Sequence, residues 1–216
     1  MVLGLYYITK LRKGAKGEGL TFYGPEEALI AYNEGKVDIH AIVNVVVKDL
    51  DKDGKIVDVM MKETSVGRVI VNEIVPAEVG YLNTIISKKS LRDIISDVIK
   101  AVGVARACEF LDGIKNLGYY MAFKGGLSFN LGDIIIPKEK ETLVQKGYDE
   151  VEQVVNNYNM GFITNNERYN QIIDTWTHVN SKLSKALIDQ LTADDDGFNS
   201  IFMMMDSGAR GSKEQI

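Results

Sequence analysis

Asn159-Met160-Gly161-Phe162-Ile163-Thr164-Asn165-Asn166-Glu167 is the stretch of sequence that decides the fold of the C-terminal half of the chain. Apolar residues recur at helical spacing on both sides of it. Thr164 and Glu167 have the spacing of a capping box, in which two side chains satisfy backbone amides at the start of a helix. The stretch therefore predicts a turn that joins two long antiparallel helices in a hairpin over residues 138–191.

The two predicted helices carry rows of apolar residues that a pair of helices is too narrow to bury by itself. These rows are Leu143, Val151, Val154 and Tyr158 on the first helix, and Tyr169, Ile173, Trp176, Leu183 and Leu187 on the second. The hairpin must pack on other elements or project as a lever, and the sequence leaves both arrangements open. Exposed apolar side chains at the tip are costly unless they contact a partner. We therefore predict a docking point at Gly161, Phe162 and Ile163.

The first half of the chain mixes strand-like and helical patterns. Two β-branched runs, 39–47 and 56–61, flank the turn signal Asp51-Lys52-Asp53-Gly54 and predict a β-hairpin. A third strand is predicted over residues 68–74. Residues 1–36 otherwise read as apolar runs separated by glycine turns, with one short helix that begins at a proline.

Two further helices are predicted over residues 90–102 and 105–123, with Gly103 between them. Ser90 and Asp93 have the spacing of a capping-box-like start. The apolar face of the second helix is predicted to contain Cys108, Leu111, Ile114 and Tyr119. The single cysteine is thus predicted to be a buried structural thiol, which fits a reducing compartment.

These patterns predict an α+β fold in two sub-domains. Residues 1–136 are expected to form the first, with strands followed by two helices and an ending in a short strand or connector. Residues 137–216 are expected to form the second, with the helical hairpin 138–191 and a terminal segment 198–216. A chain of 216 residues with 45% hydrophobic content has enough material for two small cores.

The overall charge limits the kind of partner that the chain can bind. A net charge of −5 and a pI near 5.2 argue against a broad surface for duplex nucleic acid, which needs clustered lysine and arginine. The sequence has neither a secretion signal nor an apolar run of about 18 residues. We therefore expect a cytoplasmic chain that does not contact a membrane.

Two acidic stretches imitate metal sites, and the two histidines are the other possible metal ligands. Asp49-Leu50-Asp51-Lys52-Asp53-Gly54 begins like a calcium loop, but Met60 stands where such a loop needs a bidentate glutamate. Asp194-Asp195-Asp196 is contiguous, so its side chains diverge. His40 and His178 have no neighbours at the spacing of a zinc site or a catalytic triad. We expect structural roles for both histidines and no metal site in this chain.

The C-terminal stretch Asp206-Ser207-Gly208-Ala209-Arg210-Gly211-Ser212 places one arginine between glycines. Glycines let a backbone approach an anion closely, and a guanidinium matches the geometry of phosphate oxygens. We interpret the stretch as one wall of a phosphate-handling site whose other walls lie outside residues 1–216. A flexible tail with one basic residue is the alternative that these residues leave open.

Several runs resemble, in the same order, segments of the largest-subunit (beta prime) family of bacterial RNA polymerase. They are Val2–Thr9, Gly17–Gly19, Thr64–Arg68, Glu167–Asn170, Ile173–Trp176 and Phe198–Ser212. The resemblance covers essentially the whole chain. It implies a pore-and-funnel segment that lines the secondary channel, through which nucleoside triphosphates reach the active site. It also implies that the hairpin is the coiled coil at the channel rim, where transcript-cleavage factors dock.

The same resemblance implies DNA-directed RNA synthesis by the whole enzyme, with magnesium bound by residues outside this chain. Other polymerase subunits, DNA and RNA are the implied partners. Arg210 matches the basic residue of the family's substrate loop, with Met204 and Met205 as an adaptable apolar wall beside the nucleotide. The chain alone is expected to fold but to make no RNA. The alternative is a non-catalytic interaction module, in which the hairpin binds proteins and Arg210 is incidental.

The family further suggests a pocket for the alarmone guanosine tetraphosphate that draws on Asp112, Tyr169, Asn170 and Ile173. Gln171 stands where the alarmone-responsive members carry a lysine. The loss of that cation weakens a site for an anion.

Overall fold

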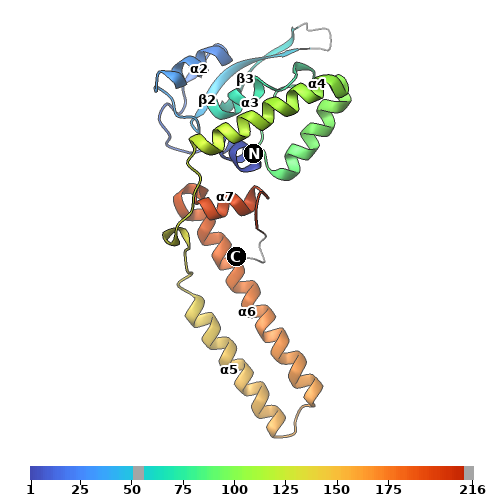
Figure 1. Ribbon diagram of the computed structural model, residues 1–216. Helices are drawn as coiled ribbons and strands as arrows, with labels where there is room; N and C mark the ends of the chain where they lie inside the picture. The colour runs from blue at the N-terminus through green and yellow to red at the C-terminus, as the bar shows by residue number, and fades with distance from the viewer. Residues whose placement is uncertain (51–55, 212–216) are drawn as a thin grey trace. The chain divides into compact units, whose positions relative to one another are not determined.

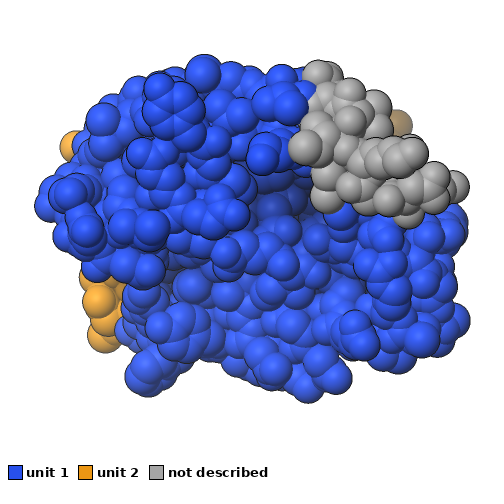
Figure 2. Space-filling model, turned by 90° about the horizontal axis from the view of Figure 1, so that it is seen from above, with its two compact units in different colours: residues 1–128, 203–210 blue, residues 129–202, 211–216 orange. Residues whose placement is uncertain are grey.

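The computed structural model describes residues 1–50 and 56–211 of the chain. These residues form two compact units, which Figure 2 distinguishes by colour. Unit 1 consists of residues 1–128 with 203–210, and unit 2 contains residues 129–202. Unit 1 contains a sheet with helices and unit 2 contains a helical hairpin, so the predicted α+β class is confirmed. The division into pore-type and funnel-type sub-domains at residue 136 stays a prediction.

The sheet of unit 1 has the strand order β1-β2-β3, and Figure 1 shows β2 and β3. β2 (Ile42–Leu50) and β3 (Ile56–Ser65) pair antiparallel, which confirms the predicted hairpin. The predicted turn Asp51–Gly54 lies outside the described residues. The short strand β1 (Thr21–Phe22) pairs parallel with β2, and the helix α2 (Pro25–Asn33) follows it as the sequence predicted. Alternate residues of β2 are buried, so one face of the sheet covers a core: Val43, Val45 and Val47.

The predicted third strand over residues 68–74 is wrong, because Val66–Asn72 forms the helix α3. The Ser65 hydroxyl caps this helix by accepting a hydrogen bond from the Arg68 backbone N–H at 3.2 Å. Most of α3 is buried, and a short apolar run that is buried on all sides shows no periodicity that separates helix from strand. Helix α3 therefore follows β3 directly and packs beneath the sheet.

Arg68 ties three segments of unit 1 together. Its side chain is buried, and its Nε donates to the Thr9 carbonyl at 3.0 Å. Its Nη1 donates to the Asn83 carbonyl at 3.0 Å and to the Asn83 side chain at 2.9 Å. The Thr64–Arg68 motif spans the junction of β3 and α3. At this place the Arg68 guanidinium satisfies two backbone carbonyls inside the fold.

The opening residues form a helix, α1 (Val2–Thr9), where the sequence predicted only apolar runs and turns. Leu5, Tyr6 and Ile8 are buried, so the helix lacks a polar face and shows no amphipathic pattern. Glycine allows its close packing, since a Cβ on Gly4 would lie 2.0 Å from the Gly118 carbonyl oxygen. The N-terminal segment is thus a core element of unit 1.

The two helices predicted after residue 88 are arms of one bent element, α4 (Lys88–Lys124). The bend lies at Gly103, whose φ of 76° is open to glycine and strained for other residues. The predicted start at Ser90 with Asp93 is wrong: Ser87 is the N-cap and forms a capping box with Ser90. The first arm buries Leu91, Ile94 and Val98, as its periodicity predicted.

The predicted apolar face of the second arm of α4 is wrong at three of its four positions, since only Ile114 among them is buried. Cys108 is exposed, as are Leu111 and Tyr119, so the prediction of a buried structural thiol fails. The buried positions recur at spacings of three and four and leave Cys108 on the next face around the helix: Ala107, Phe110, Ile114, Gly118 and Met121. The rotation of the helix about its own axis was therefore misassigned.

Unit 2 is built on the predicted hairpin. After a connector with one 3₁₀ turn (Leu131–Asp133), helices α5 (Lys140–Asn159) and α6 (Asn165–Ala193) run antiparallel (Figure 1). Thr164 and Glu167 form the predicted capping box. The helices approach closely at Gly147, which is buried against Trp176 and Val179. A second 3₁₀ turn of unit 2 (Asp194–Gly197) follows, and then α7 (Ser200–Asp206), whose residues 203–206 belong to unit 1.

Candidate functional site

The C-terminal turn, residues 206–210, is anchored within unit 1 by hydrogen bonds. The Tyr6 hydroxyl donates to the Asp206 carboxylate at 2.6 Å, and the Lys88 backbone N–H donates to the Ser207 carbonyl at 2.8 Å. Ser207 is fully buried. The turn also closes on α7, because Arg210 N–H donates to the Met204 carbonyl at 3.2 Å. These residues therefore form an ordered turn, whereas the alternative from sequence was a free tail.

The shape of the turn depends on Gly208. Its φ of 70° lies in the left-handed region, and a Cβ there would lie 3.3 Å from the Cβ of Lys88. Glycine thus lets the turn approach the first residue of α4. This contact places a loop near the C-terminus beside a helix start that is more than a hundred residues away in the chain.

The Asp206 carboxylate interacts with two side chains, Tyr6 and Lys10, whose pKa values are shifted. Burial raises the pKa of Tyr6, and its hydrogen bond to Asp206 adds to that shift, so the phenol stays a neutral donor. Burial lowers the pKa of Lys10, which the charge of Asp206 partly opposes. The carboxylate therefore holds the turn against α1.

A basic hollow of about 350 Å³ lies where the turn meets α4. Three cationic side chains line it together with Ser87 and the turn residues 206–208: Lys88, Lys89 and Arg92. All three cationic residues are exposed. The backbone N–H groups of residues 88, 90 and 91 are already bonded to Ser207 and Ser87, so these three amides are not available to an anion. We call this the basic hollow.

Sequence reasoning missed the basic hollow. Lys88 and Arg92 lie four residues apart and therefore share a helix face, which was the available signal. The other wall, the turn 206–208, comes from a distant part of the chain and could not be placed from spacing.

The structure places the predicted substrate residues on this same turn and on α7. Arg210 is exposed and follows the basic hollow by two residues along the chain. Met205 is buried and Met204 is half-buried. Their roles toward a nucleotide stay predictions, and the geometry leaves the guanidinium of Arg210 accessible to solvent.

The predicted docking residues lie at the tip of the hairpin in unit 2. Gly161 has a φ of 77°, and Phe162 is 75% exposed, whereas Ile163 is half-buried. Met160 is 69% exposed beside them and was not singled out from sequence. The tip therefore presents Met160 and Phe162 as its apolar surface.

The residues of the predicted alarmone pocket belong to both units. Asp112 lies on α4 in unit 1, where its carboxylate pairs with Lys115 at 2.7 Å. Tyr169, Asn170 and Ile173 lie together on α6 in unit 2, and all three are exposed. Binding of the alarmone stays a prediction.

Within residues 1–50 and 56–211, no three histidine, cysteine or acidic side chains come together as metal ligands. Asp194–Asp196 form a tight turn in which Asp195 and Asp196 adopt positive φ. His40 is buried with its Nδ1 3.0 Å from the Lys10 carbonyl, and His178 lies on α6 with its Nδ1 2.8 Å from the Asp174 carbonyl. None of the helices in the described part of the chain combines the length and apolar character needed to cross a bilayer.

Comparison with known proteins extends the similarity over nearly the whole chain. Residues 1–134 match the family model of RNA polymerase Rpb1, domain 3, and residues 163–216 match that of domain 4. The DNA-directed RNA polymerase beta′ subunits of Phocaeicola vulgatus and Bacteroides thetaiotaomicron are 90% and 84% identical over all 216 residues. That of Karelsulcia muelleri is 53% identical over the full chain. The chain spans about 15% of the length of these three relatives, and it belongs to the RNA polymerase Rpb1 (beta′) family.

Proposed function

We propose that this chain lines the channel through which nucleoside triphosphates reach the active site of a DNA-directed RNA polymerase. The observation that carries the proposal is the basic hollow of Lys88, Lys89 and Arg92, built against the turn that leads to Arg210. Four cations thus lie along one helix start and one anchored turn. An accessible cluster of this kind attracts polyphosphates by its summed field, although the chain as a whole is acidic.

In this proposal the chain contributes positioning and charge. RNA synthesis joins a 3′ hydroxyl to the α-phosphorus of a nucleotide with the help of magnesium, which residues outside this chain would bind. Guanidinium groups act in proteins as permanent cations and not as acids or bases, so the role we assign to Arg210 is the neutralisation of phosphate and not proton transfer. The cations of the basic hollow would meet the triphosphate before it arrives at the reaction centre.

We expect the Lys88→Gln/Lys89→Gln polymerase to need more nucleotide for half-maximal synthesis, by about three- to tenfold, at an unchanged maximal rate. Each exposed cation contributes a modest interaction that is the same in the ground state and the transition state. Single-nucleotide addition over a range of nucleotide concentrations measures both quantities. The control is Lys146→Gln/Lys185→Gln on the hairpin, which removes the same charge from exposed positions. Equal half-saturating concentrations for the two double variants would contradict the role of the basic hollow.

A second function is favoured by the exposed tip of the hairpin. Met160 and Phe162 are 69% and 75% exposed at the end of two helices of 20 and 29 residues. Apolar side chains of this size at the end of a lever are typical of a surface that binds another protein. We propose that transcript-cleavage factors of the secondary channel dock on it.

Replacing Phe162 and Ile163 with serine in the assembled polymerase should lower factor-stimulated transcript cleavage by about tenfold, because the docking contact loses its apolar anchor. Elongation on unpaused templates should stay normal, since the tip is not proposed to touch the nucleotide. Val104→Ser on α4, where the valine is 71% exposed, is the matched control. A normal response to the factor in the double variant would remove the tip from the docking surface.

A further inference from the structure

The edge of β2 is open beyond the end of β1. Two hydrogen bonds show which residues face that edge: Gly19 N–H donates to the Ile42 carbonyl at 2.8 Å, and Asn44 N–H donates to the Leu20 carbonyl at 2.8 Å. Backbone direction alternates along a strand, so Lys48 also turns its N–H and carbonyl to this side. β1 pairs only with Asn44 and Val45 of β2. Within the described residues, no strand pairs with β2 at Lys48 on this side.

A pocket of about 400 Å³ occupies the place that β1 would fill if it continued. One wall is the edge of β2, residues 46–48, and one end is formed by residues 23–26, where the chain leaves the sheet for α2. The inner side is mostly apolar, with Val69 of α3 and the buried Val75 and Val47. The volume lies in the range of about 300–1,000 Å³ that is typical of ligand pockets.

The amide of Asn72, which also lines the pocket, is fully used by the protein itself. Its Nδ2 donates to the Arg68 and Leu82 carbonyls, each at 2.8 Å, and its Oδ1 accepts from Leu82 N–H at 2.7 Å. The amide is therefore not available to a polar ligand. A bound segment would place an apolar side chain against the inner side of the pocket. Its main chain would form hydrogen bonds with the open edge of β2.

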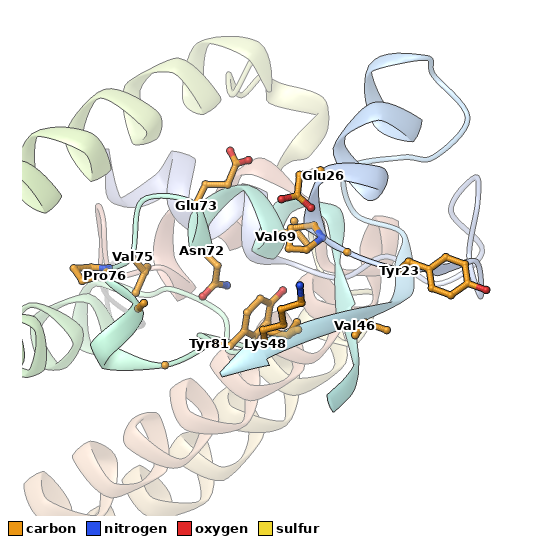
Figure 3. A pocket seen from close by; sticks show the side chains of 15 residues that line it. Tyr23, Glu26, Val46, Lys48, Val69, Asn72, Glu73, Val75, Pro76 and Tyr81 are labelled. Carbon is orange, nitrogen blue, oxygen red and sulfur yellow. The ribbon is translucent and has the colours of Figure 1, made fainter. Parts of the chain in front are cut away.

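Two carboxylates at the pocket, those of Glu26 and Glu73, favour a basic ligand over an acidic one. Glu26 and Glu73 lie on the side of the helices, opposite Lys48 and Tyr81, as Figure 3 shows. Both glutamates are exposed. An incoming segment would thus meet two carboxylates on the face where its apolar side chain enters. Because alternate residues of a strand share a face, the matching segment carries basic residues two positions from the apolar one.

We propose that this pocket is a strand-addition site, in which an extended basic and apolar polypeptide segment pairs with the edge of β2 in line with β1. The main chain of the segment would bond to Lys48, its apolar side chain would enter the pocket, and its basic side chains would meet Glu26 and Glu73. A bound segment would also cover a strand edge, which folded proteins seldom leave open. The proposal concerns a surface remote from Arg210 in sequence and does not depend on RNA synthesis.

The test uses the whole 216-residue chain and the labelled peptide Thr-Arg-Thr-Val-Thr-Arg-Thr as probe, with fluorescence anisotropy as the measurement. We expect saturable binding that protects the Lys48 amide from hydrogen exchange. The twin peptide with glutamate in place of both arginines should bind about tenfold more weakly, because like charges repel at the mouth of the pocket. Equal binding of the two peptides, or no binding of the first, overturns the proposal.

Two matched variants separate backbone pairing from charge. Lys48→Pro removes the N–H at an edge position where proline is tolerated, and should weaken binding about fivefold, whereas Lys48→Thr should leave it within about twofold. The double variant Glu26→Lys/Glu73→Lys should reverse the preference toward the acidic peptide. A double variant that still prefers the arginine peptide would show that the glutamates do not select the segment, and the site would not be the one proposed.

Discussion

Replacing Arg210 with alanine in the assembled polymerase is expected to slow nucleotide addition by about 10²–10³-fold. A preorganised donor that meets charge developing in the transition state typically contributes this much to the rate. The structure supports a preorganised role, because the turn that carries Arg210 is anchored through Asp206 and Ser207. The role proposed for Arg210 is charge stabilisation and not proton transfer, so the pH optimum should not move. Single-nucleotide addition across nucleotide concentrations and across pH measures the effect.

The Arg210→Lys variant is the control for charge alone. Lysine keeps the positive charge but loses the planar fork, so it should recover part of the rate. An effect confined to the half-saturating nucleotide concentration would indicate ground-state binding in place of transition-state stabilisation. If the alanine variant matches the parent in both quantities, Arg210 lies outside the substrate path and the turn is only a connector.

Gly67→Ala is expected to destabilise unit 1 by about 3 kcal/mol or more. A Cβ at this position would lie 1.8 Å from the Ile8 carbonyl oxygen and 2.8 Å from a side-chain carbon of Ile8. Both partners are buried, so the methyl group fits only if α1 and α3 move apart. Urea unfolding followed by circular dichroism measures the loss in free energy of unfolding.

Gly24→Ala is the matched control for Gly67→Ala. It makes the same chemical change at the start of α2, where the added Cβ would meet only the flexible end of Glu26 at 3.1 Å. Gly24→Ala should change the free energy of unfolding by no more than about 1 kcal/mol. This value includes the lower entropy of the unfolded chain, which both substitutions share. If the two variants unfold at the same urea concentration, the close approach of α1 and α3 does not limit the stability of unit 1.

Local signals in the sequence were enough for the elements whose chemistry is complete within a few residues. The Thr164/Glu167 capping box predicted the start of α6, because both partners lie within one turn of helix. The β-branched runs before and after residues 51–54 predicted β2 and β3, since their turn signal lies between them. The family resemblance was also readable from short runs alone, and the matches to both Rpb1 domains confirm it.

Tertiary structure alone decided the elements whose surroundings come from distant parts of the chain. Helices α1 and α3 are buried on nearly all sides, so no polar face marked their period, and α3 was mistaken for a strand. Cys108 is exposed because of the way α4 is turned about its own axis. The elements that pack against α4 determine this orientation. The basic hollow needed the Ser207 turn to meet the start of α4. The pocket beside β2 exists because β1 ends after two residues. Short-range propensity carries no information about such long-range contacts, because they are selected by packing between segments that are far apart in sequence.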